Sequence, residues 1–306
     1  MTELSTLTVL AYAKINLTLD VFSKRSDGYH SIASVMQSIG LHDTLVLQKT
    51  PDEGITFTCD APDAIPVPND PTNLVWRAAD MLLSRSKEAG KPLSGVAIHL
   101  EKRIPSQAGL GGGSSDAAAT LIGLNRLLGT GWSDKELIAM ASLLGSDVPF
   151  FVHGGTVVAR GRGEILNPLE DAPKMALVVV KPDVGVSTGW AYNALDTTPE
   201  RISNRATKRM EEALAKGDSE RFLAWQSNDF ELPVFEHYPR LAWLHDELRM
   251  AGAITVHLCG SGSAIYGMMA TEREAERIAN LLRSRYPLTF ATRTLTREEV
   301  NPLREL

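Results

Sequence analysis

The sequence predicts an α+β protein of two domains, which cover residues 1–164 and residues 165–306. The length of 306 residues allows two ordinary domains, each with a hydrophobic core of its own. Strand and helix patterns are mixed in the first part of the chain, and a new series of patterns starts at about residue 165. The second series approximates the order β-α-β-β-α-β with extra helices, which is typical of a ferredoxin-like domain.

Two strands of the first domain are predicted by side chains that alternate between apolar and polar. Over residues 15–21, apolar side chains alternate with Asn16, Thr18 and Asp20. We expect this strand to bury its apolar face and to present its polar face to a ligand. Residues 96–100 alternate in the same way and predict a second strand.

Three helices of the first domain are predicted by apolar side chains three or four residues apart. The first begins at about Asn73, and the second covers residues 117–128. The third opens with the capping box Ser133-Asp-Lys-Glu136 and ends near Gly145, and we expect Asp147 at the junction between this helix and a strand that begins with residues 148–151. Residues 51–72 are rich in Pro, Asp and Asn, so we expect loops with short extended pieces there.

The elements of the second domain follow from the same rules. An apolar run at residues 176–180 predicts a buried strand, and the capping box Thr271-Glu-Arg-Glu274 predicts the start of a helix. The other expected elements are two helical stretches and three strands, at residues 200–227, 238–250, 254–259, 263–269 and 288–295.

The loop of residues 105–115 is the most informative segment, because four glycines and the adjacent serines Ser114 and Ser115 lead directly into a predicted helix. Glycine lets the backbone adopt positive φ and approach a ligand closely. The free N–H groups and the dipole at the start of a helix attract an anion. The pattern therefore predicts a phosphate-binding loop. The alternative is a flexible Gly/Ser linker, which the helix former directly behind the loop disfavours.

The spacing of this loop excludes the common phosphate-binding motifs. A Walker loop requires Gly-Lys-Ser/Thr, and no lysine follows Gly113. A dinucleotide fingerprint counted from Gly109 requires glycine where Ser114 stands. The protein-kinase motifs are absent as well. Residues 185–189 match the Gly-x-Ser-x-Gly elbow of hydrolases in letters only, because Pro182 separates them from the preceding strand.

Composition limits the partners of the protein. The formal net charge of -6 argues against a binder of nucleic acid or of anionic membranes. No apolar run reaches about 18 residues, and the N-terminus lacks the form of a signal peptide. Cys59 and Cys259 lie far apart and suit a reducing compartment. We expect a cytoplasmic protein, monomeric or weakly dimeric, with a local anion site.

Four motifs resemble those of the GHMP small-molecule kinases, a family named for galactokinase, homoserine kinase, mevalonate kinase and phosphomevalonate kinase. Residues 105–118 are similar to the phosphate loop of that family, and residues 13–19 to its N-terminal motif. Residues 145–151 resemble the segment that carries the catalytic aspartate, and residues 260–263 resemble the third motif. The four motifs stand in the family's order.

The resemblance implies the two-domain GHMP kinase fold, in which an N-terminal nucleotide-binding domain and a C-terminal ferredoxin-like domain enclose the substrate. It implies ATP and Mg²⁺ as cofactors. Residues 25–30, Arg-Ser-Asp-Gly-Tyr-His, resemble members that phosphorylate the 2-hydroxyl of 4-diphosphocytidyl-2-C-methyl-D-erythritol, a cytidine diphosphate polyol, in non-mevalonate isoprenoid precursor biosynthesis. Two alternatives are a kinase of the same family for homoserine, mevalonate or a sugar, and a non-catalytic nucleotide sensor.

The resemblance also assigns roles to two charged residues. It implies that Asp147 is the general base and that Lys14 pairs with Asp147, keeps it ionised and orients the attacking hydroxyl. Taken alone, Asp147 would be a capping or solvent-facing aspartate, and Lys14 a surface lysine with a buried stem.

The remaining site residues are carried over by position. The implied nucleotide contacts are Asn73, Lys102, Pro105, Gly109, Leu110, Gly111, Gly112, Gly113, Ser114 and Ser115. The implied substrate contacts are Asn16, Tyr29, His30, Asp147, Thr188, Tyr192, Gly260, Ser261 and Gly262. Tyr29 and His30 would bind the cytosine, with Tyr192 on its opposite face, and Ser115 would be a metal ligand. Without the resemblance, Ser115 indicates a helix cap, Tyr29 and His30 indicate turn packing, and residues 260–263 indicate a hairpin turn.

Overall fold

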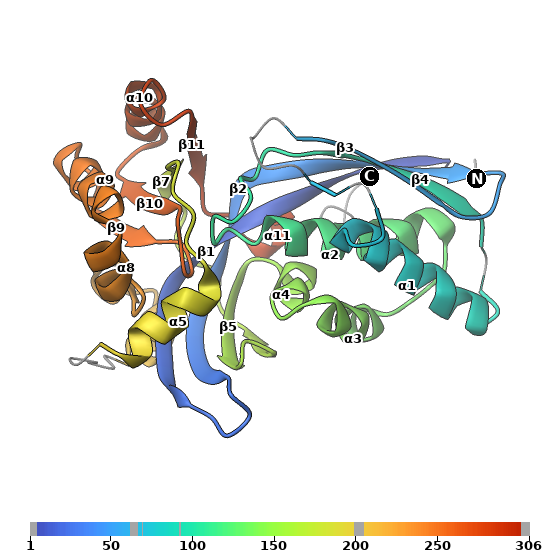
Figure 1. The fold of residues 1–306 in the computed structure, drawn as a ribbon, viewed down its shortest axis with the longest axis horizontal. Helices are drawn as coiled ribbons and strands as arrows, with labels where there is room; N and C mark the ends of the chain where they lie inside the picture. Colours follow the sequence, from blue (N-terminus) through green and yellow to red (C-terminus); the bar gives the residue numbers. More distant parts are fainter. Residues whose placement is uncertain (1–4, 62–66, 69, 92, 199–204, 301–306) are drawn as a thin grey trace.

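The computed structural model describes most of the chain, namely residues 5–61, 67–68, 70–91, 93–198 and 205–300. Within these ranges the strands form one seven-stranded and one four-stranded sheet. Figure 1 shows an elongated molecule in which two long strands run from the region of the smaller sheet to the far end of the larger one. These strands physically connect the two halves of the molecule.

The long strands are β1 (Thr6–Lys24) and β2 (His30–Thr50), which pair antiparallel. Their register shifts between Tyr12 and Ala13 and again between Asn16 and Thr18. Such bulges bend a strand and re-aim its side chains. The larger sheet has the order β3-β4-β2-β1-β8, with β5 paired to β2 and β6 to β5. The bounds are β3 (Ile55–Asp60), β4 (Gly95–Glu101), β5 (Thr156–Gly161), β6 (Ile165–Pro168) and β8 (Ser227–Asn228).

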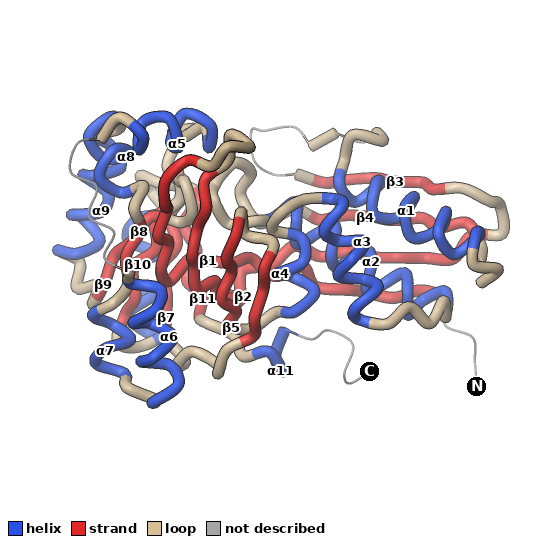
Figure 2. Tube along the Cα trace, turned by 90° about the horizontal axis from the view of Figure 1, so that it is seen from below, coloured by secondary structure: helices blue, strands red, loops and turns tan. Residues whose placement is uncertain are grey.

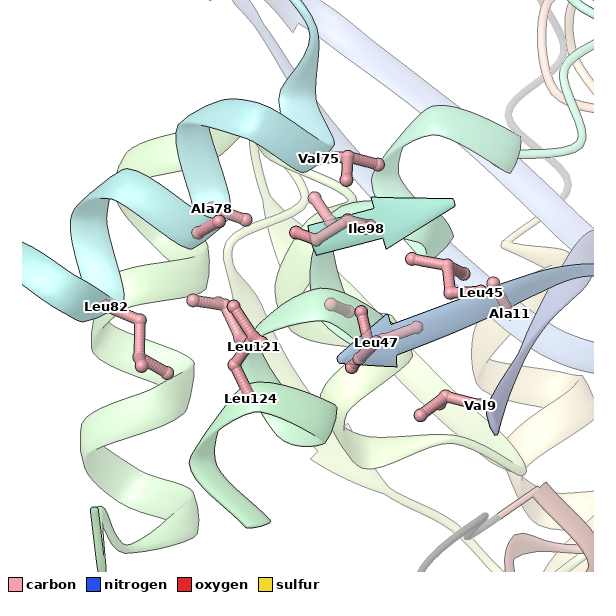
Figure 3. Packing of buried hydrophobic residues seen from close by; sticks show 14 of the residues in the cluster. Val9, Ala11, Leu45, Leu47, Val75, Ala78, Leu82, Ile98, Leu121 and Leu124 are labelled. Atoms are coloured by element: carbon pink, nitrogen blue, oxygen red, sulfur yellow. The ribbon is translucent and has the colours of Figure 1, made fainter. Parts of the chain in front are cut away.

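Helices α1 (Leu74–Glu88), α2 (Gly112–Leu128) and α3 (Asp134–Leu144) pack beside the larger sheet, as Figure 2 shows. In Figure 3, side chains of α1 and α2 such as Ala78 and Leu121 meet Leu47 and Ile98 of the sheet. The predicted apolar spacing is confirmed by this core. The predicted capping box of α3 is also present, since Ser133 accepts from Glu136 N and the Glu136 carboxylate accepts from Ser133 N.

The smaller sheet confirms the ferredoxin-like prediction. Its strands are β7 (Ala176–Lys181), β9 (Thr255–Leu258), β10 (Ile265–Met269) and β11 (Leu288–Arg293). They lie in the order β11-β7-β10-β9, and every neighbouring pair is antiparallel. The helices that follow β6 along the chain are α5 (Thr188–Asp196), α6 (Ala206–Lys216), α7 (Ser219–Ala224), α8 (Glu231–His237), α9 (Pro239–Met250), α10 (Glu272–Leu282) and α11 (Arg297–Val300). The last of them contacts Gly154 and Gly155, next to the larger sheet.

Strand β7 is apolar without alternation because both faces of its sheet are covered. Val178 and Val180 belong to the core that includes Leu244 of α9 and other residues of α9 and α10. Leu177 and its neighbours on the other face belong to the core that includes Ile15 of β1. The smaller sheet therefore packs directly against the middle of β1, which places that strand between the two halves of the molecule.

The structure corrects two predictions and limits a third. Residues 148–151, expected to begin a strand after Asp147, belong instead to the short helix α4 (Val148–His153). The helical stretch expected at residues 200–227 is divided into α6 and α7, and residues 199–204 lie outside the described residues. The division at residue 165 stays a prediction, although β6 pairs with β5 across it.

Candidate functional site

The predicted phosphate loop does lead into a helix, and its glycines are needed for their backbone shape. Gly109 and Gly111 have φ of 75° and 73°, in the region that favours glycine. A Cβ on Gly109 would lie 1.8 Å from the Cys259 carbonyl oxygen, and one on Gly111 would lie 2.5 Å from the Phe151 ring. Among the described residues no side chain caps α2, so its first-turn N–H groups can bind an anion.

Two cavities lie on either side of this loop, and Gly109 and Gly111 line both of them. The larger, of about 460 Å³, is lined by predicted nucleotide residues that include Asn73, Lys102, Pro105, Gly112, Gly113 and Ser114. The smaller, of about 190 Å³, is lined by predicted catalytic and substrate residues, namely Lys14, Asn16, Asp147, Thr188, Tyr192, Gly260 and Ser261. We call them the nucleotide cavity and the acceptor cavity.

The two predicted catalytic residues meet in the acceptor cavity. Lys14 Nζ lies 3.8 Å from Asp147 Oδ2, and the side chains are 6% and 44% exposed, respectively. Lys14 Nζ also donates to Asn16 Oδ1 over 2.8 Å, and the Lys14 backbone N–H donates to Leu110 O of the loop over 3.0 Å. Asp147 precedes α4, but its side chain does not cap that helix. A buried ammonium thus faces a solvent-accessible carboxylate beside the glycine loop.

The prediction for the polar face of β1 is wrong for two of its three residues. Asn16 reaches the acceptor cavity, and its Nδ2 donates to Ser34 Oγ over 2.8 Å. Thr18 is instead within 2.9 Å of the Thr207 hydroxyl, and Asp20 accepts from the backbone N–H groups of Ala206 and Thr207. The two residues hold the start of α6, because a carboxylate satisfies first-turn donors that a helix leaves free.

Of the predicted base-binding residues, His30 and Tyr192 form a stacked pair, whereas the Tyr29 side chain is exposed. His30 is buried, its Nε2 lies 2.7 Å from Asp196 Oδ1, and its ring stacks on Tyr192 with centroids 4.9 Å apart. Tyr29 is 59% exposed on the turn after β1, with the Arg162 guanidinium over its ring at 5.0 Å. The stacked rings touch directly, so the structure does not hold His30 and Tyr192 apart as two walls of a base slot.

The electrostatics of the acceptor cavity affect Tyr192. Burial, and to a lesser degree the Asp147 carboxylate, raise the pKa of Tyr192. Its hydroxyl therefore stays protonated near neutral pH and can donate a hydrogen bond. At the other end of the cavity, the Thr188 and Ser261 hydroxyl oxygens lie 2.9 Å apart, which ties α5 to the third glycine motif.

Lys102 lines the nucleotide cavity but is held by two carboxylates. Its Nζ lies 2.8 Å from Asp116 Oδ2 and also binds Asp43, whose other oxygen accepts from Ile104 N. Burial alone would lower the pKa of Lys102, yet Asp116 and Asp43 outweigh it and raise that pKa. Burial raises the pKa of Asp116, whose Oδ1 has no partner among the described residues.

Asn73 and Ser115 both use their side chains to hold the protein backbone. Asn73 caps α1, accepting from Val75 N over 2.8 Å, while it lines the nucleotide cavity. The Ser115 hydroxyl donates to Tyr12 O over 2.7 Å, so the helix cap expected there is wrong. Ser115 lies outside the lining of the nucleotide cavity. Within the described ranges, no three His, Cys, Asp or Glu side chains cluster as a metal site.

Sequence reasoning missed Ser34 and Phe230, which line the acceptor cavity, and Asp43, which binds Lys102. None of the three stands in a recognisable motif, so no local signal pointed to them. Asp116 stands inside the predicted phosphate-loop motif, which assigns it no role. Among the helices that the structure describes, none is both long and apolar enough to span a bilayer.

Comparisons with known proteins agree with this geometry. The model of the GHMP kinases N terminal domain matches residues 73–155, and that of the GHMP kinases C terminal region matches residues 210–288. A protein of Moorella thermoacetica named 4-diphosphocytidyl-2-C-methyl-D-erythritol kinase is 44% identical over 291 residues, which covers 94% of this chain and 99% of that protein. A protein of the same name from Pelotomaculum thermopropionicum is 42% identical, with coverage of 94% and 98%.

Solved structures support the same conclusion. The crystal structure of a 4-(cytidine 5'-diphospho)-2C-methyl-D-erythritol kinase has a TM-score of 0.78 and 35% identity, and the match covers 94% of this chain and 99% of that one. A homoserine kinase from Cytophaga hutchinsonii, with a TM-score of 0.74 and 20% identity, shares the fold over 97% of this chain and 96% of its own. By its sequence and by its two-domain fold, the chain belongs to the GHMP kinase family.

Proposed function

We propose that the protein transfers the γ-phosphoryl group of ATP to the 2-hydroxyl of 4-diphosphocytidyl-2-C-methyl-D-erythritol, in non-mevalonate isoprenoid precursor biosynthesis. The observation that carries the proposal is the pair of cavities that share one glycine loop, with Lys14 and Asp147 in the second of them. Relatives that cover nearly the whole chain bear the name of a kinase for this substrate.

The nucleotide cavity would hold ATP with its phosphates at the start of α2. Phosphoryl transfer needs positioned phosphates and donors that neutralise developing charge. The N–H groups around Gly111 and Gly112 supply such donors, and each preorganised donor is worth about 10²- to 10³-fold in rate. Because Gly109 and Gly111 line both cavities, a phosphoryl group bound at the loop would lie next to the acceptor cavity.

In the acceptor cavity, Asp147 would accept the proton of the attacking hydroxyl. Its carboxylate is accessible and is not consumed by a helix cap, so it can reach a bound alcohol. Lys14 would hold that carboxylate and the hydroxyl in place from a fixed position on β1. General-base catalysis of this kind contributes about 10²- to 10⁴-fold.

Mg²⁺, when bound with ATP, would neutralise charge on the phosphate oxygens, and most of its ligands would be phosphate oxygens and water molecules. The nucleotide cavity fits such a cation, because Asp116 lines it and the Oδ1 atom of this residue, which has no partner among the described residues, could supply one protein oxygen. Ser115 could act as a metal ligand only if its hydroxyl gave up the hydrogen bond to Tyr12 O and turned toward the nucleotide. The cation would therefore depend mainly on the nucleotide.

The cytidine end of the substrate would bind near Tyr29, His30 and Tyr192, after the His30–Tyr192 stack opens or offers one of its faces. Thr188 and Ser261 would bind the polar part of the acceptor. We place the protein in the cytoplasm as a monomer or a weak homodimer. Its partners would be ATP and this cytidine diphosphate polyol.

The test is a substrate panel with a matched pair of variants. Wild type with ATP and Mg²⁺ should release ADP with the cytidine compound but not with homoserine, mevalonate or a sugar. Asp147→Asn should lower kcat about 10²- to 10⁴-fold and keep ATP affinity. Asp246→Asn, at a carboxylate that is 71% exposed, is the control and should keep full activity.

Each rival function predicts a different result in this panel. Turnover of another alcohol with none of the cytidine compound would favour a different kinase of the family. ATP binding without turnover of any alcohol by wild type would favour a nucleotide sensor.

A further inference from the structure

A short polar segment outside every predicted motif joins two walls of the acceptor cavity. It is the tetrapeptide Asn228-Asp-Phe-Glu231, which runs from the end of β8 to the first residue of α8. Each of its three polar side chains bonds to the backbone of another part of the chain. Side-chain bonds of this kind fix where distant backbone segments lie.

Asn228 makes the central contacts. Its Nδ2 donates to Leu258 O over 2.9 Å and to Gly260 O over 2.7 Å, while its Oδ1 accepts from Phe230 N over 3.0 Å. The residue is 5% exposed, and it pairs with Leu19 of β1. Both amide hydrogens are thus directed to the carbonyls that lead into the third glycine motif.

The two flanking side chains support the same connection. Asp229 Oδ2 accepts from Val21 N of β1 over 2.7 Å. Glu231 Oε1 accepts from Leu258 N over 2.9 Å and lies 3.0 Å from His257 Nδ1. The segment therefore binds the end of β1 on one side and the end of β9 on the other.

The turn that Asn228 holds stands directly against Lys14 and Asn16. A Cβ on Gly260 would lie 3.5 Å from both Lys14 Nζ and Asn16 Oδ1. Phe230, between the two anchors, lines the acceptor cavity and contacts the Tyr192 ring with centroids 4.9 Å apart. A shift of the turn would change the shape of the acceptor cavity next to Lys14.

We propose that Asn228 is a positioning residue for the acceptor: it fixes the Gly260 turn against Lys14 and so determines how the acceptor, and not ATP, is bound. This role presupposes the proposed function of the acceptor cavity. The nucleotide cavity does not include Asn228 or the Gly260 turn in its lining. The effect of losing the two donated bonds should therefore be selective.

The experiment compares Asn228→Asp and Asn228→Ala with Ser227→Ala. The carboxylate in Asn228→Asp keeps the shape but faces two carbonyl oxygens, and Asn228→Ala leaves both carbonyls unpaired. Ser227 is the matched control, since its buried Oγ has no partner among the described residues. KM for the acceptor, KM for ATP, ATP affinity in the absence of acceptor and thermal unfolding are measured for each variant.

Both Asn228 variants should raise KM for the acceptor about 10- to 100-fold, because small misplacements of a binding wall have effects of this size. ATP affinity should change less than about threefold, and Ser227→Ala should behave as wild type. Equal losses for ATP and acceptor, an unchanged acceptor KM, or variants that do not fold would each overturn the proposal. If wild type itself does not phosphorylate the cytidine compound, the proposed function fails, and titration of the acceptor alone still tests Asn228.

Discussion

The two cavities beside the glycine loop differ in how the chain builds them. Most of the nucleotide cavity comes from one continuous stretch, residues 102–116, with a second contribution around Asn73. The acceptor cavity takes side chains from β1, β2, the start of α4, α5, Phe230 and the third glycine motif. A local stretch carries its shape in its own sequence, whereas an assembled cavity depends on how distant segments are held together.

The largest effect is expected from the buried charges in the wall of the nucleotide cavity, which test whether this local stretch holds its own shape. Lys102→Met leaves Asp43 and Asp116 without their shared ammonium. Removing one partner of a buried ion pair costs about 3–5 kcal/mol, so the free energy of unfolding should fall by that amount. Denaturant unfolding of Lys102→Met and of Lys174→Met, whose lysine is 67% exposed, provides the measurement and its control. A loss below about 1 kcal/mol would show that the cluster is not structural.

The glycine loop gives the next largest effect. Gly111→Ala introduces a Cβ at positive φ and places it 2.5 Å from Phe151. Strain and overpacking together should cost about 2–4 kcal/mol and weaken ATP binding. Gly129→Ala is the matched control, because Gly129 has φ of 66° with open space around it and should show only the strain, about 1 kcal/mol. Equal losses in the two variants would mean that the contact with Phe151 relaxes freely.

The same difference explains how far the sequence could predict the structure. The turn of the glycine loop into a helix, the buried face of α2 and the capping box of α3 depend on residues within a few positions of one another, and the structure confirms these local features, while phosphate binding by the loop stays a prediction. The order of elements in the ferredoxin-like half was also visible, because each element carries its own periodicity. The catalytic pair came from a family resemblance, and the structure brings it together.

The failures concern residues whose partners are distant in the chain. Thr18 and Asp20 alternate with apolar residues, a pattern that predicts a ligand on their side of the strand, yet α6 covers them. No residue near them in the sequence indicates that helix. Lys102 finds Asp43 at a separation of 59 residues. Asn228 has no local signature, since its importance lies in two carbonyls of another strand end. Periodicity reports which face is buried or polar but not what covers it.

Asp116 gives a smaller effect that depends on pH. Burial raises its folded-state pKa above the ordinary value of 3.8, so the folded protein holds the proton to higher pH than the unfolded chain. Its contribution to stability is therefore lost as pH rises from about 3.8 through the folded pKa. Asp116→Asn removes this titration. Melting temperatures of the two proteins from pH 4 to 8 should diverge with rising pH, and parallel curves would contradict the assignment.

The smallest effect separates a structural serine from a metal-binding one. Ser115→Ala removes the bond from the hydroxyl to Tyr12 O, which should cost about 1 kcal/mol of stability. The Mg²⁺ concentration for half-maximal activity should hardly change, because the cation depends on the phosphates of ATP. Ser114→Ala, in the wall of the nucleotide cavity, is the companion variant. The opposite outcome would be a Mg²⁺ requirement that rises about tenfold in Ser115→Ala while stability stays the same. The Ser115 hydroxyl would then be a metal ligand in the nucleotide site, supplied by residues 102–116, and not a structural donor to Tyr12 O.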